Sequence, residues 1–233
     1  MQEWFAKIAQ MFEAAFITKN RWKLYLDGLG VTLQVAVFAA IIGMIIGTVL
    51  AFMKLSVKRN GKKTILAVIA NIYIDVIRGT PSVLQLMIMW FIIFSNAKNG
   101  VAVAVLSFGV NSGAYVAEIV RAGILAVDKG QMEAGRSLGL SKAQTMVYVV
   151  IPQAVKNVLP PIGNEFIVLL KETAIVGYVS LTDLTRAANQ IASRTYNAFM
   201  PLIGAAVIYF AVIKALTMLL EKLEGRLRKS DNR

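Results

Sequence analysis

Long apolar runs constrain the fold of this chain more than any other feature. They cover approximately residues 31–55, 64–94, 101–127, 154–179 and 201–220. A helix of about 20 consecutive apolar residues crosses a bilayer. Hydrophobic residues make up 57% of the chain, whereas a typical soluble domain has about 45–50%. The sequence therefore predicts one all-α membrane domain with five transmembrane helices.

Residues 1–24 precede these runs and predict an amphipathic helix. Its apolar residues recur at helical spacing: Trp4, Phe5, Ile8, Met11, Phe12, Ala15 and Phe16. The segment is too polar to span a membrane, so a helix lying in the bilayer interface fits its composition. The alternative is a helix packed on a partner protein.

The distribution of Lys and Arg predicts the orientation. Fourteen of them lie in residues 54–63, residues 128–160 and the tail from Lys222, whereas seven lie in the segments on the opposite side. Basic residues are retained on the cytoplasmic side. We therefore expect an external N-terminus, with the 128–160 region and the C-terminus in the cytoplasm. The net charge of +12 then reflects topology, and no aromatic residues are interleaved with the basic clusters as nucleic-acid binding would require.

The composition argues against catalysis by this chain. It contains no Cys and no His, which removes thiol chemistry and the commonest metal ligand. Gly61-Lys62-Lys63-Thr64 matches only the end of a phosphate-binding loop and lacks its glycine-rich part. We expect no catalytic residue, no metal and no bound nucleotide.

Two apolar runs contain helix-breaking residues. Arg78-Gly79-Thr80-Pro81 interrupts the second run and predicts a kink or a short re-entrant break. Pro160-Pro161 predicts a hinge or a static bend in the fourth. Gly43 and Gly47, four residues apart in the first run, allow another helix to approach closely.

Several motifs resemble the polar amino acid branch of type I ABC importer permeases. The resemblance covers approximately residues 25–222. The matching segments are Gly30–Leu33, Asp75–Pro81, Ala117–Ile124, Glu133–Gly139 followed by Ile151–Ala154, and Asn164–Thr173. Two positions depart from the family pattern: Gly135 replaces the usual second Ala of its Glu-Ala-Ala loop, and Asp75 replaces a usual Glu.

The resemblance implies that the cytoplasmic loop 128–152 contains a coupling helix that docks into a separate ATPase. The loop residues suit this role, because small side chains give a slim profile while charged and apolar side chains offer contacts. The expected coupling residues are Glu133, Ala134, Gly135, Arg136, Leu138 and Gly139. Without the resemblance, the same residues describe an ordinary turn between two spans.

Charged residues within the apolar runs admit two interpretations. Asp75 and Arg78 are three residues apart, as are Glu118 and Arg121, so each pair can neutralise itself. Alternatively, they line a cavity for a zwitterion, where Arg78 clamps a carboxylate and an acidic residue holds an ammonium group. The candidate substrate-binding residues are Asp75, Arg78, Gly79, Thr80, Asn111, Ser112, Glu118 and Asn164.

The resemblance implies a MetI-like transmembrane domain at residues 25–222, followed by a charged cytoplasmic tail at 223–233. Its partners would be a second permease chain, two ATPase subunits that bind ATP and Mg²⁺, and an extracytoplasmic amino acid-binding protein. A homodimer is favoured over a pair of different permeases, and the location would be a bacterial cell membrane. The alternatives are an importer for another small polar solute (a sulfur compound or an opine), an intramembrane enzyme and a passive channel.

Overall fold

The computed structural model describes residues 1–56 and 62–231, and within them the chain forms helices and no β-strand. The α-helices are α1 (Gln2–Phe12), α2 (Trp22–Leu55), α3 (Ile65–Arg78), α4 (Ser82–Ile88), α5 (Gly100–Leu125), α6 (Lys129–Ser137), α7 (Lys142–Thr145), α8 (Ile151–Glu172), α9 (Leu184–Thr195) and α10 (Phe199–Asp231). Shorter helical turns are η1 (Glu13–Ile17), η2 (Thr18–Asn20), η3 (Met89–Ile93), η4 (Met146–Val150) and η5 (Thr173–Val179). The all-helical class is confirmed. The basic segment 54–63 falls partly on residues 57–61, outside the described ranges.

Three helices, α2, α5 and α10, are long and apolar enough to cross a membrane, and a bent pair makes four if it counts as one span. That pair is α3 and the α4–η3 segment, and the chain bends by 102° between them. The predicted break at Arg78–Pro81 is therefore confirmed. α8 has 22 residues but is more polar, because Lys156, Glu165 and Lys171 lie within it. Five spans remain a prediction.

The centre of the bundle is the contact between α2 and α5. A Cβ atom built on Gly47 of α2 would lie 2.6 Å from Cβ of Val116 on α5. On α5, a Cβ atom on Gly113 would lie 2.8 Å from Cγ2 of Ile46. Small residues on both helices therefore let the two backbones approach. The close approach predicted at Gly47 is confirmed, and Gly113 is its counterpart on the facing helix.

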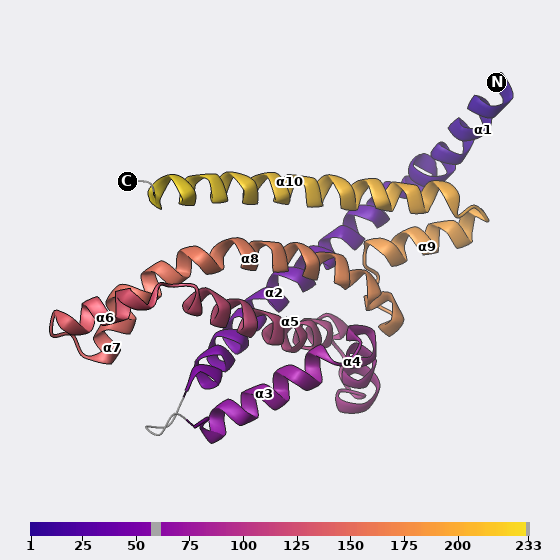
Figure 1. Ribbon diagram of the computed structural model, residues 1–233. Coiled ribbons are helices and arrows are strands. Elements are labelled where there is room, and N and C mark those ends of the chain that lie inside the picture. Colours follow the sequence, from indigo (N-terminus) through magenta and orange to yellow (C-terminus); the bar gives the residue numbers. More distant parts are fainter. Residues whose placement is uncertain (57–61, 232–233) are drawn as a thin grey trace.

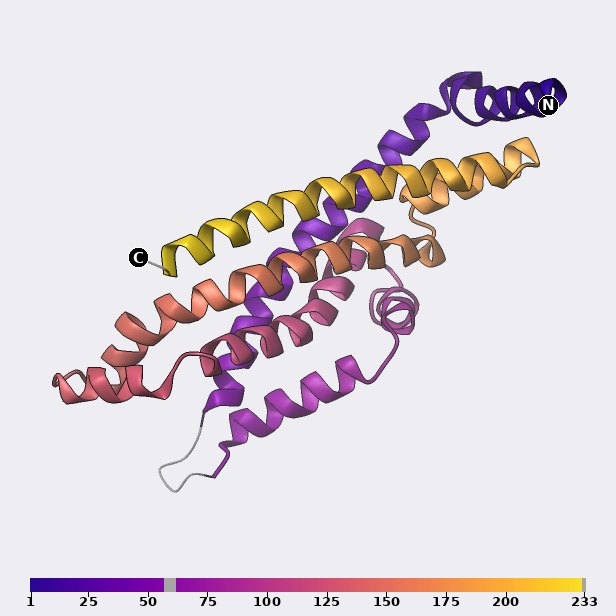
Figure 2. The ribbon, with the colours of Figure 1, turned by 45° about the horizontal axis from the view of Figure 1, so that its top comes forward.

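The two ends of the bundle carry different elements. Figures 1 and 2 show α6 and α7 projecting at one end, and α1 and α9 at the opposite end. The visible C-terminal part of α10 extends towards the α6–α7 end. The charged tail is helical through Asp231, as a continuation of the last apolar segment.

A buried polar cluster fixes the start of α9. Asp183 is fully buried, and its carboxylate accepts hydrogen bonds from the N–H groups of Thr185 and Arg186, both at 3.0 Å. The hydroxyl of Tyr209 on α10 donates to the same carboxylate at 3.4 Å. Burial raises the pKa of Asp183, although the N–H donors oppose that shift. α9 is thereby attached to α10 at the end of the molecule opposite α6.

Candidate functional site

The 128–152 loop is built from local capping interactions. Asp128 caps α6, since its Oδ1 accepts a hydrogen bond from the N–H of Gly130 at 2.7 Å. Ser141 caps α7 through a reciprocal pair of hydrogen bonds with Gln144. These contacts satisfy backbone N–H groups at the starts of both helices. Met132 and Met146 also pack the loop against Ile124 and Ala154 of the bundle. Five of the six predicted coupling residues are exposed: Glu133, Ala134, Arg136, Leu138 and Gly139.

The sixth coupling residue, Gly135, is buried between α6 and α7. A Cβ atom at this position would lie 2.4 Å from Cγ2 of Thr145. Thr145 is itself fully buried. The departure from the family pattern at Gly135 therefore has a local reason, because the threonine methyl group occupies the space that an alanine side chain would need.

Leu138 projects from the turn after α6. Its side chain is 85% exposed. The following residue, Gly139, has a φ of +88°, which favours glycine. Nη1 of Arg136 donates to the carbonyl of Leu140 at 2.7 Å and closes the turn. The loop thus presents one large apolar side chain on a braced turn, a suitable anchor for a groove on another protein.

The break between α3 and α4 is held by Gln85, a residue that the sequence interpretation did not select. Its Nε2 donates to the carbonyl of Ile77 at 2.8 Å and to Oγ1 of Thr80 at 2.7 Å. Its Oε1 accepts a hydrogen bond from Nδ2 of Asn111 at 2.9 Å. Gln85 therefore satisfies a carbonyl near the end of α3 and connects the break to α5.

Asn111, proposed from sequence to contact substrate, is only 4% exposed. Its amide nitrogen is bonded to Gln85. The structure therefore gives Asn111 a bracing contact beside the break.

The two expected ion pairs have different outcomes. Nη2 of Arg121 lies 2.8 Å from Oε2 of Glu118, so this pair forms. Asp75 and Arg78 form no ion pair within the described residues, which corrects that expectation. The guanidinium of Arg78 instead lies 5.2 Å from the ring centroid of Tyr115 on α5. The aromatic face thus draws the arginine away from its neighbour three residues earlier.

Glu118 has a second cationic partner. Lys54, near the end of α2, also pairs with its carboxylate. With Arg121 on its other oxygen, Glu118 is neutralised by two positive charges. This arrangement favours a structural link between α2 and α5 over the binding of a substrate ammonium group.

A cavity of about 280 Å³ lies between α2, α5 and α8. Ser112 of α5 and Glu165 of α8 both line it, and Oγ of Ser112 donates to Oε1 of Glu165 at 3.1 Å. The remaining lining is largely apolar, including Met44 and Phe166. A carboxylate with one hydroxyl partner in an apolar cavity can accept a cationic group.

Glu165 lies within the motif Asn164–Thr173 but is not among the candidate ligands selected from the sequence. The signal available was its neighbour Asn164, which was selected instead. Asn164 is exposed on α8 and does not line the cavity. Adjacent helical residues point in different directions, and the structure places Glu165 on the side facing α5.

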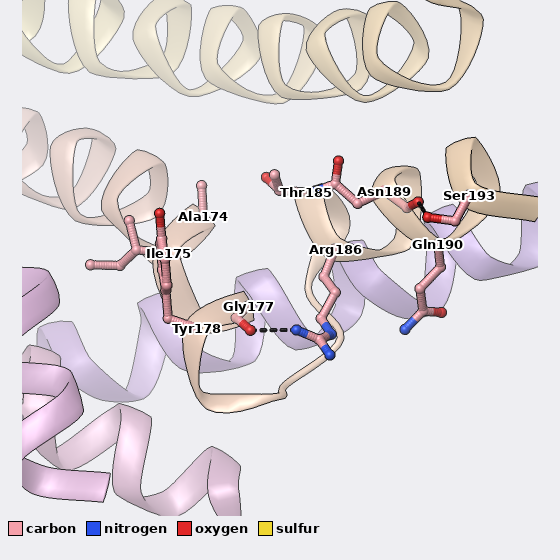
Figure 3. Close-up of a pocket in the computed structure, with 9 residues that line it drawn as sticks. All are labelled: Ala174, Ile175, Gly177, Tyr178, Thr185, Arg186, Asn189, Gln190 and Ser193. Carbon is pink, nitrogen blue, oxygen red and sulfur yellow. Dashed lines mark hydrogen bonds between the residues drawn. The ribbon is translucent and has the colours of Figure 1, made fainter. Parts of the chain in front are cut away.

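A second cavity, of about 670 Å³, lies between η5 and α9 at the end opposite the 128–152 loop. Figure 3 shows Arg186 reaching from α9 towards the η5 segment, where it donates to the carbonyl of Gly177. Polar side chains cover the α9 side of this cavity: Thr185, Arg186, Asn189, Gln190 and Ser193. No three His, Cys, Asp or Glu side chains converge as metal ligands in the part of the chain that the structure describes.

Comparison with known proteins gives matches along most of the chain. Residues 43–229 match the family described as binding-protein-dependent transport system inner membrane component. The arginine transport system permease protein ArtQ of Bacillus subtilis is 43% identical, with 88% of this chain and 93% of the relative covered. The glutamine transport system permease protein GlnP of Escherichia coli is 34% identical, with 88% and 93% covered.

Two solved transporter structures also match this chain. The crystal structure of an amino acid ABC transporter with histidines has a chain 44% identical to this one, with a TM-score of 0.82. That match covers 91% of this chain and 98% of the other. The MetNI methionine ABC transporter matches with a TM-score of 0.76 at 20% identity, covering 88% and 97% of the two chains. This second likeness shows the fold alone.

Proposed function

Because the chain belongs to the family of binding-protein-dependent transport system inner membrane components, we propose that it is the permease subunit of an ATP-driven importer for a polar amino acid. The observation that carries this proposal is the projecting 128–152 loop with its exposed Leu138. A braced apolar anchor at the tip of a membrane bundle needs a partner that covers it. In an importer that partner is the ATPase, which binds ATP and Mg²⁺.

The proposed substrate class rests on two supports. Curated relatives that share 43% and 34% identity are arginine and glutamine permeases. The cavity beside Glu165 has about 280 Å³, and pockets for small molecules start at about 300 Å³. A single amino acid is of suitable size for such a space. An importer for another small polar solute, such as a sulfur compound or an opine, remains the alternative.

We assign the ammonium group of the amino acid to Glu165 in the cavity. We assign its carboxylate to Arg78, an exposed residue at the end of α3 outside the cavity lining. A guanidinium binds a carboxylate through two parallel hydrogen bonds. Ser112 holds the carboxylate of Glu165 in place. The exposed residues at the break supply further polar contacts: Asp75, Gly79 and Thr80. Glu118, Asn111 and Asn164 stay candidate ligands with weaker support, because the first two have protein partners.

Coupling then follows from the loop geometry. ATP-driven closure of two ATPase subunits moves the coupling helix α6, and α5 and α8 flank the loop that contains it. The bundle alternates between inward-facing and outward-facing states around one site. A passive channel would have no use for the exposed anchor. An intramembrane enzyme would need a nucleophile with a base, and the chain has no Cys or His.

The membrane arrangement completes the proposal. Residues 1–24 form the interfacial helix unit, 25–222 the transmembrane domain with five spans, and 223–233 the cytoplasmic tail. The N-terminus is external, and the 128–152 loop lies in the cytoplasm of a bacterial cell. Two permease chains, by preference identical, enclose the pathway, and an external binding protein delivers the amino acid. The exposed Trp4, Phe5 and Phe12 support a bilayer contact for α1.

The test of coupling is ATP hydrolysis by the transporter reconstituted in nanodiscs with its ATPase and binding protein. We expect Glu133→Lys to abolish the stimulation by binding protein, because the charge reversal falls on the docking surface. Glu221→Lys is the matched control, since Glu221 is also exposed but lies on α10, outside the loop. Unchanged stimulation in Glu133→Lys would remove the support for coupling through this loop.

The test of the cavity is uptake of radiolabelled arginine and glutamine into proteoliposomes. We expect Glu165→Gln to reduce uptake by at least about tenfold, the effect of losing one charge-assisted contact of about 1.4 kcal/mol or more. Glu221→Gln serves as the control. Normal uptake in Glu165→Gln would reject the cavity assignment while leaving the coupling proposal intact.

A further inference from the structure

The cations on the proposed external side are concentrated in one place. Lys and Arg are uncommon on that side of membrane proteins, yet four of the seven external ones line a single cleft of about 870 Å³. These four are Lys19, Arg21, Lys23 and Arg194. The cleft lining contains no Asp or Glu, and none of the four forms an ion pair with the side chains that the structure describes. A concentration of unbalanced positive charge is a binding surface for an anion.

Two segments distant in sequence build this cleft. One is the turn η2, where Lys19 and Asn20 both have positive φ, at 55° and 54°. The other is the end of α9, with Arg194 and the exposed Tyr196. Nη1 of Arg21 donates to the carbonyl of Ala14 in η1 and holds the turn in place. The cations are therefore presented by a defined fold and not by a loose chain end.

The surroundings of the cleft have the character of a membrane interface. η2 connects α1, which carries exposed aromatic residues, to α2, which is long enough to span the bilayer. Trp22, the first residue of α2, is 43% exposed, and Nζ of Lys23 lies 5.6 Å from its ring centroid. Tryptophan and basic side chains occur together at the level of lipid headgroups. The cleft thus opens where a headgroup would lie.

We propose that this cleft binds the phosphate headgroup of an anionic phospholipid and so attaches the η2 turn and the end of α9 to the bilayer. The phosphodiester would lie between Lys19, Lys23 and Arg194, and the guanidinium of Arg194 offers a fork of donors that matches phosphate oxygens. A lipid fits better than an acidic protein because the cleft adjoins exposed aromatic residues at a helix start. The inference rests on the proposed membrane placement and not on the identity of the transported solute.

The experiment is native mass spectrometry of the purified transporter with its ATPase, titrated in detergent with phosphatidylglycerol or phosphatidylcholine. We expect saturable retention of phosphatidylglycerol and little of phosphatidylcholine. Lys19→Gln with Arg194→Gln removes two charges, and each contributes about fivefold to anionic lipid affinity. The expected loss of phosphatidylglycerol affinity is therefore about 25-fold.

The matched control is Lys7→Gln with Lys98→Gln, which removes the same charge from two exposed external positions outside the cleft. We expect this control to stay within about twofold of the native affinity, because it leaves the cleft unchanged. Equal losses in both double variants would overturn the proposal, since they would indicate unspecific attraction. Undiminished retention in the cleft variant would overturn it as well.

Two further arms identify the source of the anion and guard against misfolding. Lys19→Arg with Lys23→Arg keeps the charge and should keep the lipid, and each variant must co-purify with the ATPase. If millimolar inorganic phosphate displaces the lipid completely, the site is one for small anions and the lipid assignment fails. If the cleft variant keeps its lipid but loses stimulation by binding protein, the cleft belongs to protein docking. Loss of lipid with intact arginine or glutamine uptake would support the lipid site independently of the transport proposal.

Discussion

Proline occurs in both the α3–α4 segment and α8, with opposite structural consequences. At Pro81 the chain bends by 102° between the two helical parts. α8 runs without interruption from Ile151 to Glu172, although Pro160 and Pro161 both lie inside it. Each proline removes a backbone N–H and crowds the preceding turn. The residue type alone therefore does not decide whether a helix breaks.

The contacts that α5 makes with each segment explain why one helix breaks at proline and the other continues. Beside the break, the buried Asn111 of α5 donates to Gln85, and Gln85 in turn satisfies the carbonyl of Ile77. Beside the α8 prolines, α5 presents Gly123, where an added Cβ would lie 2.2 Å from Cγ2 of Val158. A sharp break persists where a side chain takes up freed backbone groups, and close packing holds the other helix continuous.

Among these variants, Gln85→Leu is expected to lower stability the most. The variant removes the donor for Ile77 and the acceptor for Asn111, so a buried amide loses its partner. Leaving such a group unsatisfied costs about 1–3 kcal/mol. We expect a lower midpoint in thermal unfolding of the reconstituted transporter, together with loss of amino acid uptake because the break is no longer held.

Gln85→Glu separates the two halves of this contact. Glutamate keeps an acceptor for Asn111 but has no donor for the carbonyl of Ile77. We expect its unfolding midpoint to lie between those of the native protein and Gln85→Leu. A Gln85→Leu protein as stable as the native one would show that the bend does not depend on this network.

A smaller effect is expected at Gly79, the residue that ends α3. A Cβ atom there would lie 2.7 Å from the carbonyl oxygen of Asp75, so Gly79→Ala should lower stability by about 1 kcal/mol through local strain. Gly30→Ala is the matched control, because nothing lies within 4 Å of its added Cβ. In a helix interior that change is neutral or stabilising. Equal unfolding midpoints for both variants would argue against a strained break.

Local features of these segments were predictable from the sequence, and contacts between distant residues were not. The break was predictable, because Gly79 and Pro81 act on the backbone locally. Gln85 was not identifiable, since its partner Asn111 lies 26 residues away, and the Glu165 cavity depends on a contact with Ser112 across 53 residues. Single-sequence patterns do not encode which distant side chains meet.

The coupling loop was predictable only in part. Its small and exposed residues were predicted as a docking element from the sequence motif. The reason for Gly135 was not, because Thr145, which would collide with an alanine there, belongs to a neighbouring helix that the motif does not include. The exposure of the other coupling residues is the part that the structure shows, and their docking function stays a prediction. Prediction stopped where two elements pack together.

The smallest effect on stability is expected from Pro160→Ala with Pro161→Ala. The two new N–H groups can donate to the carbonyls four residues earlier, those of Lys156 and Asn157. Because α8 is already continuous there, we expect a gain of less than about 1 kcal/mol. If the proline pair is a hinge, the stiffer helix will slow arginine or glutamine uptake while the unfolding midpoint rises slightly. Uptake at the native rate would instead identify a static bend in α8.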